Sequence, residues 1–500
     1  MTVAGPLIPH CLGEKIMRHL LSNPVIKSLA LAAMASFSLP FSLNAQIRYE
    51  LVVPEVFGSQ INRAGTRGNE INENGETLLN RVATFAVWKD GATTNVVNAN
   101  TDYPASLSRI GAASINKFQQ AVGTKTYIVR DDNGSRFDTF PFYWDPSNGL
   151  VDLDDIGARS PLGAGSTSLF DINEVGMAIG TSQNFAGEDI VGNSAFAWSF
   201  ETGRIDIPAL DTIETHSVTT PKAISESGNV VGTYRLFLDS AAHYTERAFL
   251  FEPNAGSVDL EDFDADFFQA THSTARDINR HEKMVGELDQ GAYLYDLAKR
   301  AGHFIPAPSD SAGAIRAYAL NDKDIVAGTA EMRDSDGHSG FSPILWSEDT
   351  GTIDLMPHLE QKLAGILPEG VDSLDCRITP KSINNRGQIS ASLETQASFS
   401  REVVLNPVLE FDWNSMTPTS ENGVRGVLYR HDKAQLEGTI PASALGYDIG
   451  FECSSDMQNW SPIETENGAI RHLETDDSIE LFLPFSDCVF VRPVLVTASN

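Results

Sequence analysis

Three cationic residues, Lys222, Arg276 and Lys381, occupy the same place in a short phrase that recurs along the chain. Each lies three residues before a Ser or Asn that follows an aliphatic residue, and Tyr318 holds that place in another copy. Lysine and arginine side chains that converge on one site bind anionic groups. Two placements remain open: these side chains line a central channel, or they point between repeats and pair with neighbouring acids.

The recurring phrase is I-N-x-x-G, and its Asn is the anchor of a repeat unit. The seven anchors are Asn72, Asn116, Asn173, Ser225, Asn279, Asn321 and Asn384. Their mean spacing of about 52 residues is typical of propellers, solenoids or arrays. Asn followed three residues later by Gly predicts a turn between two strands. Gln119, Glu282 and Asp324 replace this glycine in three units, which are expected to turn differently.

Each unit continues with signals for further strands. A glycine seven residues after the anchor, as at Gly180, predicts a bulge or a close backbone approach. An aromatic or aliphatic run such as AFAW follows, and then G-x-[IV]-D-[IL], as in GRIDI from Gly203. Four short strands without helical periodicity predict a propeller blade. The prediction is an all-β chain with a seven-bladed β-propeller of four-stranded blades over residues 46–411.

The seventh unit lacks the G-x-[IV]-D-[IL] strand. Residues 49–54 (YELVVP) read as such a strand without a unit in front of it. We expect this strand to close the ring beside residues 403–406, since closure removes the exposed sheet edges of an open ring.

The units resemble the extracellular HAF-repeat proteins, which are secreted bacterial chains of propeller type. AISESGNVVGT at residues 223–233, SAFAW at residues 194–198 and RAFLF at residues 247–251 carry the resemblance, which covers residues 46–411. The His that precedes Ala-Phe in that family is absent here, and the first and last repeats are degenerate. The resemblance implies the fold and export only, because the family has no well-defined activity.

The N-terminal segment has the pattern of a signal peptide. From Met17 the chain reads as a basic start, an apolar run and the small residue Ala45. Pro40 and several serines interrupt the run before it reaches the length of a membrane span. Residues 1–45 are therefore predicted to be a signal peptide, with translation starting at Met1 or Met17. A secreted, periplasmic or cell-surface protein without a transmembrane segment after cleavage is expected.

Composition limits the classes of partner. The 500 residues are 41% hydrophobic, which suits a large core, and the net charge is -31. Nucleic acid and anionic membranes are disfavoured because both are bound by clustered Lys and Arg.

A separate C-terminal region begins where the repeats stop. Residues 412–446 are predicted to be a linker and domain entry, and residues 447–500 a small β-sandwich. The stretch YDIGFECSSDMQNWSPI resembles a C-terminal module of secreted bacterial proteins, which implies attachment, spacing or carbohydrate binding. Its matching positions are Phe451, Ser454, Asp456, Met457 and Trp460. Cys453 and Cys488 lie in strand-like runs and are the predicted disulfide, which leaves Cys376 as a buried thiol.

Acids and histidines in the repeats are candidates for catalytic or metal-binding groups. Asp152, Asp206, Asp259 and Asp354 occupy equivalent places in the fourth strand, and such regular repetition favours a structural role. His216 and His272 are expected to be packing or surface residues, and no catalytic motif is present. Two acidic loops either hold calcium or are solvated turns. They contain Asp131, Asp132, Asn133 and Asp138, and Asp334 and Asp336.

Two functional hypotheses follow. The first is an exported, non-catalytic binding or scaffold protein whose ligand, an acidic glycan among the candidates, contacts Lys222, Arg276, Tyr318 and Lys381. The alternative is a propeller hydrolase or lyase that acts on a polysaccharide or other anionic polymer. Three or more ionisable groups within hydrogen-bond reach of one another at the channel mouth would favour the enzyme. No cofactor is predicted beyond the calcium considered above.

Overall fold

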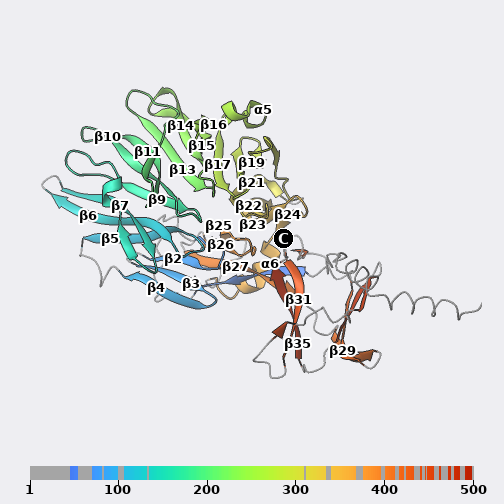
Figure 1. Cartoon of the computed structure of the whole chain (residues 1–500). Coiled ribbons are helices and arrows are strands. Elements are labelled where there is room, and N and C mark those ends of the chain that lie inside the picture. Colours follow the sequence, from blue (N-terminus) through green and yellow to red (C-terminus); the bar gives the residue numbers. More distant parts are fainter. Residues whose placement is uncertain are drawn as a thin grey trace, which may run out of the picture.

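A computed structural model describes residues 46–54, 70–81, 84–98, 106–131, 134–308, 311–333, 339–367, 376–395, 400–410, 416–421, 424–432, 440–441, 445, 447–454, 461–462, 471–474, 478–484 and 490–497. The predicted signal peptide lies outside these residues. The described chain is all-β apart from a few short helices (Figure 1). No helix among the described residues is long and apolar enough to cross a membrane.

The strands within each repeat unit, named here by its anchor residue, pair antiparallel, and the sheets are arranged around a centre (Figure 1). A short parallel pairing of Gly192 with Ser217 and of Asn193 with Val218 joins two of the sheets. The Asn116 unit has β5 (Leu107–Ile115), β6 (Ala121–Asp131), β7 (Gly134–Asp145) and β8 (Gly149–Asp152). The Asn173 unit has β9 (Thr167–Ile172), β10 (Ala178–Ala186), β11 (Asp189–Ser199) and β12 (Gly203–Ile207). The Ser225 unit has β13 (Ser217–Ile224), β14 (Val230–Ser240), β15 (His243–Glu252) and β16 (Gly256–Asp259).

The remaining units follow the same order. The Asn279 unit has β17 (Ser273–Ile278), β18 (Lys283–Leu288), β19 (Gly291–Asp296) and β20 (Ala301–Phe304). The Asn321 unit has β21 (Ser311–Leu320), β22 (Val326–Arg333), β23 (Ser339–Ser347) and β24 (Gly351–Asp354). The Asn72 unit has β2 (Thr77–Arg81), β3 (Thr84–Lys89) and β4 (Ala92–Asn98), and the Asn384 unit has β25 (Cys376–Ile383), β26 (Ile389–Thr395) and β27 (Ser400–Glu410). Short helices follow three fourth strands: η1 (Asp154–Ile156), α4 (Leu260–Phe263) with α5 (Ala265–Phe268), and α6 (Met356–Leu363).

The N-terminal strand β1 (Gln46–Val52) completes the Asn384 unit. It pairs antiparallel with β27, with Glu50 opposite Asn406 and Val52 opposite Val404. This pairing confirms the predicted ring closure. The side chains of Ile47, Tyr49 and Leu51 are buried, so the strand contributes apolar surface as well as backbone hydrogen bonds.

The turn after each anchor has the same backbone geometry in all seven units. The residue three positions after the anchor has a left-handed φ, whether it is glycine or one of Gln119, Glu282 and Asp324, whose φ values are 60°, 59° and 61°. The prediction that these three units turn differently is therefore wrong. Left-handed φ costs a non-glycine residue about 1–2 kcal/mol. Contacts with the preceding unit offset this cost, since the Glu282 carboxylate accepts hydrogen bonds from Ser227 and Asn229, each at 2.8 Å.

The anchor side chains join the units into a closed ring. In six of the seven units the Asn amide nitrogen donates to the anchor carbonyl of the next unit at 2.8–3.0 Å, and Asn384 donates to Asn72. Ser225 has no amide, and the Glu282 carboxylate supplies the link to the Asn279 unit instead. This ring of inner strands around a centre is the arrangement of a β-propeller.

The hydrophobic core lies between units rather than within them. Each hydrophobic cluster of described residues combines side chains from two adjacent units. Phe85 of the Asn72 unit, for example, stacks on Phe142 of the Asn116 unit at 5.5 Å between ring centroids. A single unit cannot bury its own apolar faces, so stability depends on closure of the ring.

The C-terminal region departs from the predicted boundary. β28 (Met416–Glu421) and β29 (Val424–Asp432) lie in the segment predicted to be a linker, and they form a sheet with β34 (Ser478–Pro484) and β33 (Arg471–Glu474). The Asn-Gly pair between β28 and β29 is a hairpin signal that sequence reasoning assigned to a linker. A second sheet contains β31 (Tyr447–Ser454), β32 (Ser461–Pro462) and β35 (Phe490–Thr497), while β30 (Ile440–Pro441) pairs with β1.

The cysteines are only partly placed. Cys453 lies in β31, and Cys488 lies outside the described residues, so the predicted disulfide remains a prediction. Cys376 is buried at the start of β25, as expected.

Candidate functional site

A bulge in the first strand of six units sets the direction of the predicted site residues. Strand pairing skips the residue three positions before the anchor. The skipped residues are Ala113, Phe170, Lys222, Arg276, Tyr318 and Lys381. A bulge places two residues opposite one partner residue and re-aims a side chain.

The strand glycine explains the close approach at five of these bulges. A Cβ at Gly180 would lie 2.0 Å from the Ser168 carbonyl oxygen, and one at Gly286 would lie 1.9 Å from that of Thr274. Side chains are excluded there because the two backbones touch. The predicted bulge and close approach are both confirmed.

The bulged residues line one pocket of about 250 Å³ at the centre of the ring, and this pocket and the one beside it are together called the channel. Lys222, Arg276, Tyr318 and Lys381 all border it, together with Phe170 and Ala113. The structure therefore brings the four predicted site residues together from β13, β17, β21 and β25. The equivalent Asn69 lies outside the described residues.

Two carboxylates that act on these cations belong to the same unit as their partner. The Arg276 Nε atom lies 3.2 Å from a carboxylate oxygen of Glu287 in its own sheet, and its guanidinium lies over the Tyr318 ring at 5.3 Å. Burial raises the pKa of Glu402 to about 7, and the positive charge of Lys381 opposes that shift. Arg276 thus lines the pocket while pairing within its own unit, which differs from the predicted alternative of a salt bridge between units.

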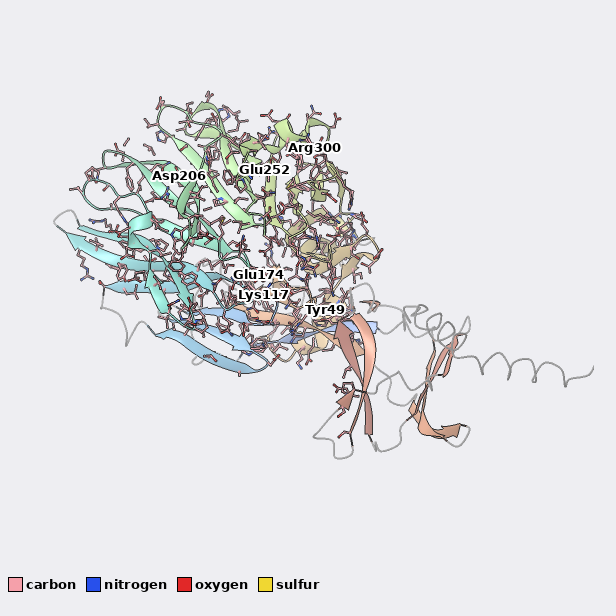
Figure 2. The ribbon with its side chains drawn as sticks, in the orientation of Figure 1. Tyr49, Lys117, Glu174, Asp206, Glu252 and Arg300 are labelled. Carbon is pink, nitrogen blue, oxygen red and sulfur yellow. The ribbon has the colours of Figure 1, made fainter. Side chains whose placement is uncertain are left out.

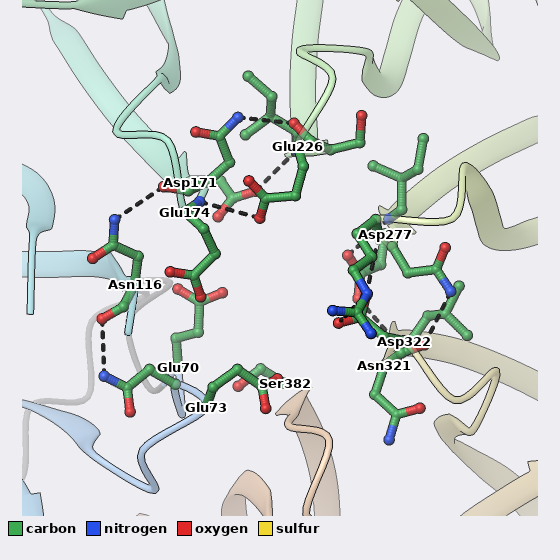
Figure 3. Close-up of a pocket in the computed structure, with 18 of the residues that line it drawn as sticks. Glu70, Glu73, Asn116, Asp171, Glu174, Glu226, Asp277, Asn321, Asp322 and Ser382 are labelled. Carbon is green, nitrogen blue, oxygen red and sulfur yellow. Dashed lines mark hydrogen bonds and ion pairs between the residues drawn. The ribbon is translucent and has the colours of Figure 1, made fainter. Parts of the chain in front are cut away.

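Next to this pocket lies a second one, of about 170 Å³, and seven of the 22 residues that line it are Asp or Glu (Figure 3). Glu70, Asp171, Asp277 and Ser382 border both pockets. They stand two residues before their anchors, and each accepts a backbone N–H from the next unit. The Asp277 carboxylate accepts from Leu320 at 2.7 Å, and that of Asp171 accepts from Ile224 at 3.0 Å. These side chains hold neighbouring units together at the middle of the channel.

Four of the seven residues that directly follow the anchors are acids, while Lys117 and Arg280 hold this place in two other units. Glu73, Glu174, Glu226 and Asp322 follow their anchors directly, and each accepts a backbone N–H of the preceding unit at 3.1–3.2 Å. In Figure 3 they border the pocket, and Figure 2 places Lys117 and Glu174 at the inner ends of the sheets. Among the described residues no group of three or more His, Cys, Asp or Glu is arranged to hold a metal ion. Neither set of acids was predicted, although EINE at residues 70–73 and DINE at residues 171–174 carried the signal.

The other acids and histidines lie away from both pockets. Asp152 pairs with Lys125 at 2.5 Å and Asp206 with Arg204 at 2.7 Å, each within its own sheet. Asp259 accepts from Tyr234, and Asp354 accepts from Ser342, again within one unit. His216 and His272 precede the first strands β13 and β17 and border neither pocket.

Of the two candidate calcium loops, one is partly described. Asp138 is buried, pairs with Arg136 at 3.2 Å and accepts the backbone N–H of Gly165. Asp132, Asn133, Asp334 and Asp336 lie outside the described residues.

Burial gives the central carboxylates a distinct titration behaviour. It raises the pKa of Asp277 to about 7, with hydrogen bonds from Leu320 and Ile278 opposing the shift and Asp171 adding to it. Burial likewise raises the pKa of Asp171 and of Glu70. An unfolded Asp titrates near pH 4. The folded state therefore binds the extra proton between about pH 4 and pH 7, and stability falls as pH rises through this interval.

Replacing Asp277 with Asn should flatten this pH dependence. Removing one titrating group lowers the slope of the unfolding free energy by up to about 1.4 kcal/mol per pH unit between pH 5 and pH 7. Urea unfolding at several pH values measures the slope, and Asp206→Asn, an exposed carboxylate paired with Arg204, is the control. Parallel profiles for Asp277→Asn and the unmodified chain would contradict the assignment.

Comparisons with known proteins add the following similarities. A family model described as a protein of unknown function (DUF3466) matches residues 163–305. No curated protein is significantly similar to the chain. An acylaminoacyl peptidase from Pyrococcus horikoshii has 9% identity over 78% of this chain and 58% of that chain, with a TM-score of 0.37. This chain thus spans less than two thirds of that peptidase.

Two further solved structures match this chain over a larger share of their own length. The β-propeller domain of the Trilobed protease from Pyrococcus furiosus has 10% identity over 62% of this chain and 98% of that chain, with a TM-score of 0.28. A gluconolactonase from Xanthomonas campestris has 12% identity over 58% of this chain and 89% of that chain, with a TM-score of 0.28. Their activities are properties of those proteins, and the β-propeller arrangement of this chain follows from its own strand pairing and inter-unit contacts.

Proposed function

We propose that this chain is an exported, seven-bladed β-propeller with a small C-terminal β-sandwich, and that it binds an anionic group of an acidic glycan at the cationic end of its channel. The closed ring of seven anchors supports the blade number. The signal-peptide pattern and the resemblance to HAF-repeat proteins support export.

One observation carries the binding proposal. Lys222, Arg276 and Lys381 stand on equivalent bulged residues around one pocket, in a chain whose net charge is -31. Gathering like charges at one site is unfavourable unless a counter-charge offsets it. Glu287 pairs with Arg276, Glu402 interacts electrostatically with Lys381, and Glu70, Asp171 and Asp277 border the same pocket. Burial raises the pKa of Glu70, Asp171, Asp277 and Glu402, which reduces the negative charge that these acids carry, so an anion in the pocket would offset the cations more fully.

A non-catalytic role is supported by the engagement of the nearby carboxylates. Glu70, Asp171 and Asp277 hold backbone N–H groups of adjacent units, so proton transfer would disturb contacts that join the ring. The enzyme alternative is favoured by one observation, which is that Asp277 borders the cationic pocket with a pKa of about 7, near the working range of a general acid or base.

The double variant Lys222→Ala/Lys381→Ala tests the proposal. Binding of fluorescent polygalacturonate to the full chain should weaken tenfold or more, because loss of a buried charge contact costs about 2–5 kcal/mol. Lys299→Ala removes an exposed cation from outside the channel and should leave binding unchanged. Equal affinity for polygalacturonate and neutral dextran would overturn the proposal. Release of unsaturated or reducing sugar ends would instead support the lyase or hydrolase alternative.

A further inference from the structure

A row of alternating arginine and aromatic side chains leads outward from the cationic pocket. The Arg276 guanidinium lies over the Tyr318 ring at 5.3 Å, and the Tyr318 hydroxyl accepts a hydrogen bond from Arg377 at 3.1 Å. The Arg377 guanidinium lies 4.7 Å from the Phe341 ring centroid, and that of Arg316 lies 5.9 Å from the same centroid. We call these five residues the arginine–aromatic row.

The outer part of the row follows the junction between two units. Arg316 and Tyr318 lie on β21 and Phe341 on β23 of the Asn321 unit, while Arg377 lies on β25 of the Asn384 unit. Arg316 is exposed, and Tyr318, Phe341 and Arg377 are half-buried. The row is thus accessible along part of its length and continuous with the pocket through Tyr318.

The positive charge of the outer row has no described counter-charge. Neither Arg316 nor Arg377 has a carboxylate of the described residues within 4.0 Å. The Nε atom of Arg377 is buried and donates no hydrogen bond to any of them. Two guanidinium groups beside one phenyl ring repel each other, and a bound anion would relieve that repulsion. Arginine is suited to this because its planar fork binds carboxylate or sulfate through two parallel hydrogen bonds.

We infer that the arginine–aromatic row is a second subsite, and that the ligand is an acidic oligosaccharide with charges on successive sugar rings. The inference rests on the proposed function, because the pocket receives the first acidic sugar. Arg316 and Arg377 bind the acidic group of a following sugar.

Galacturonic acid and its linear trimer distinguish one subsite from two. By calorimetry on the full chain, the trimer should bind at least tenfold more tightly than the monomer. The double variant Arg316→Ala/Arg377→Ala should bind the trimer about tenfold more weakly and should bind the monomer with unchanged affinity. Lys222→Ala should weaken both ligands. Arg235→Ala is the matched control, since Arg235 lies over Tyr244 at 4.0 Å in the Ser225 unit, away from the row.

Each outcome bears on one proposal or on both. Equal affinity for monomer and trimer, or a trimer affinity that is insensitive to Arg316→Ala/Arg377→Ala, would overturn the second subsite. If the monomer still depended on Lys222, the proposed function would stand. Tighter binding of triglutamate than of the trimer would overturn the assignment to an oligosaccharide. Absence of binding by all three ligands would overturn both proposals.

Discussion

Replacing Tyr49 and Leu51 together with alanine should lower the free energy of unfolding by about 5 kcal/mol or more. Both side chains are buried in the cluster that joins the first strand to the Asn384 unit. The Tyr49 hydroxyl also donates to the Gly387 carbonyl at 2.8 Å, in the turn that follows the last anchor. Domains are stable by only about 5–15 kcal/mol, so this loss is a large part of the total.

Urea unfolding monitored by tryptophan fluorescence measures this effect. Glu50→Ala is the control on the same strand, because Glu50 forms an exposed ion pair with Lys362 at 2.7 Å. Such pairs contribute about 0–1 kcal/mol. A double variant within about 1 kcal/mol of the unmodified chain would mean that β1 does not hold the ring closed.

Replacing Asn384 with alanine is expected to have the second largest effect, a loss of about 3–5 kcal/mol, since each buried polar group left without a partner costs about 1–3 kcal/mol. The oxygen of the Asn384 side-chain amide accepts hydrogen bonds from the backbone N–H groups of Arg386 and Gln388, each at 3.0 Å. Its amide nitrogen donates to the Asn72 carbonyl at 2.9 Å across the ring closure. The side chain is buried, so water cannot replace these bonds.

Asn384→Ser separates the two roles of this side chain. At the equivalent place Ser225 accepts the backbone N–H of Asn229, so a serine keeps part of the turn while losing the bond between units. The serine variant should therefore be intermediate in thermal and urea unfolding. Equal losses for the serine and alanine variants would show that the bond to Asn72, rather than the turn, provides the whole effect.

Much of the fold was encoded locally in the sequence. The anchor phrase specifies a turn because Asn can bond its own backbone and the following residues supply the left-handed position. The strand glycine predicts the close approach at the bulge because any Cβ there meets a carbonyl oxygen. The absent fourth strand in the last unit, together with an unassigned strand at the start, predicted the ring closure by β1. Equivalent positions in repeats also predicted that Lys222, Arg276, Tyr318 and Lys381 would meet.

Other features depend on contacts between units, which a single repeat does not reveal. Glu282 stands where other units have glycine, and its carboxylate accepts hydrogen bonds from Ser227 and Asn229 of the preceding unit. These two partners lie 55 and 53 residues away in sequence. The acids of the channel were visible as residue types, but only closure of the ring buried them and gave them backbone N–H partners in neighbouring units. The arginine–aromatic row likewise joins Arg377 to Tyr318 across a boundary between units. Sequence periodicity determined which residues are equivalent, and the packing of one unit on the next decided which of them are buried, paired or exposed to a pocket.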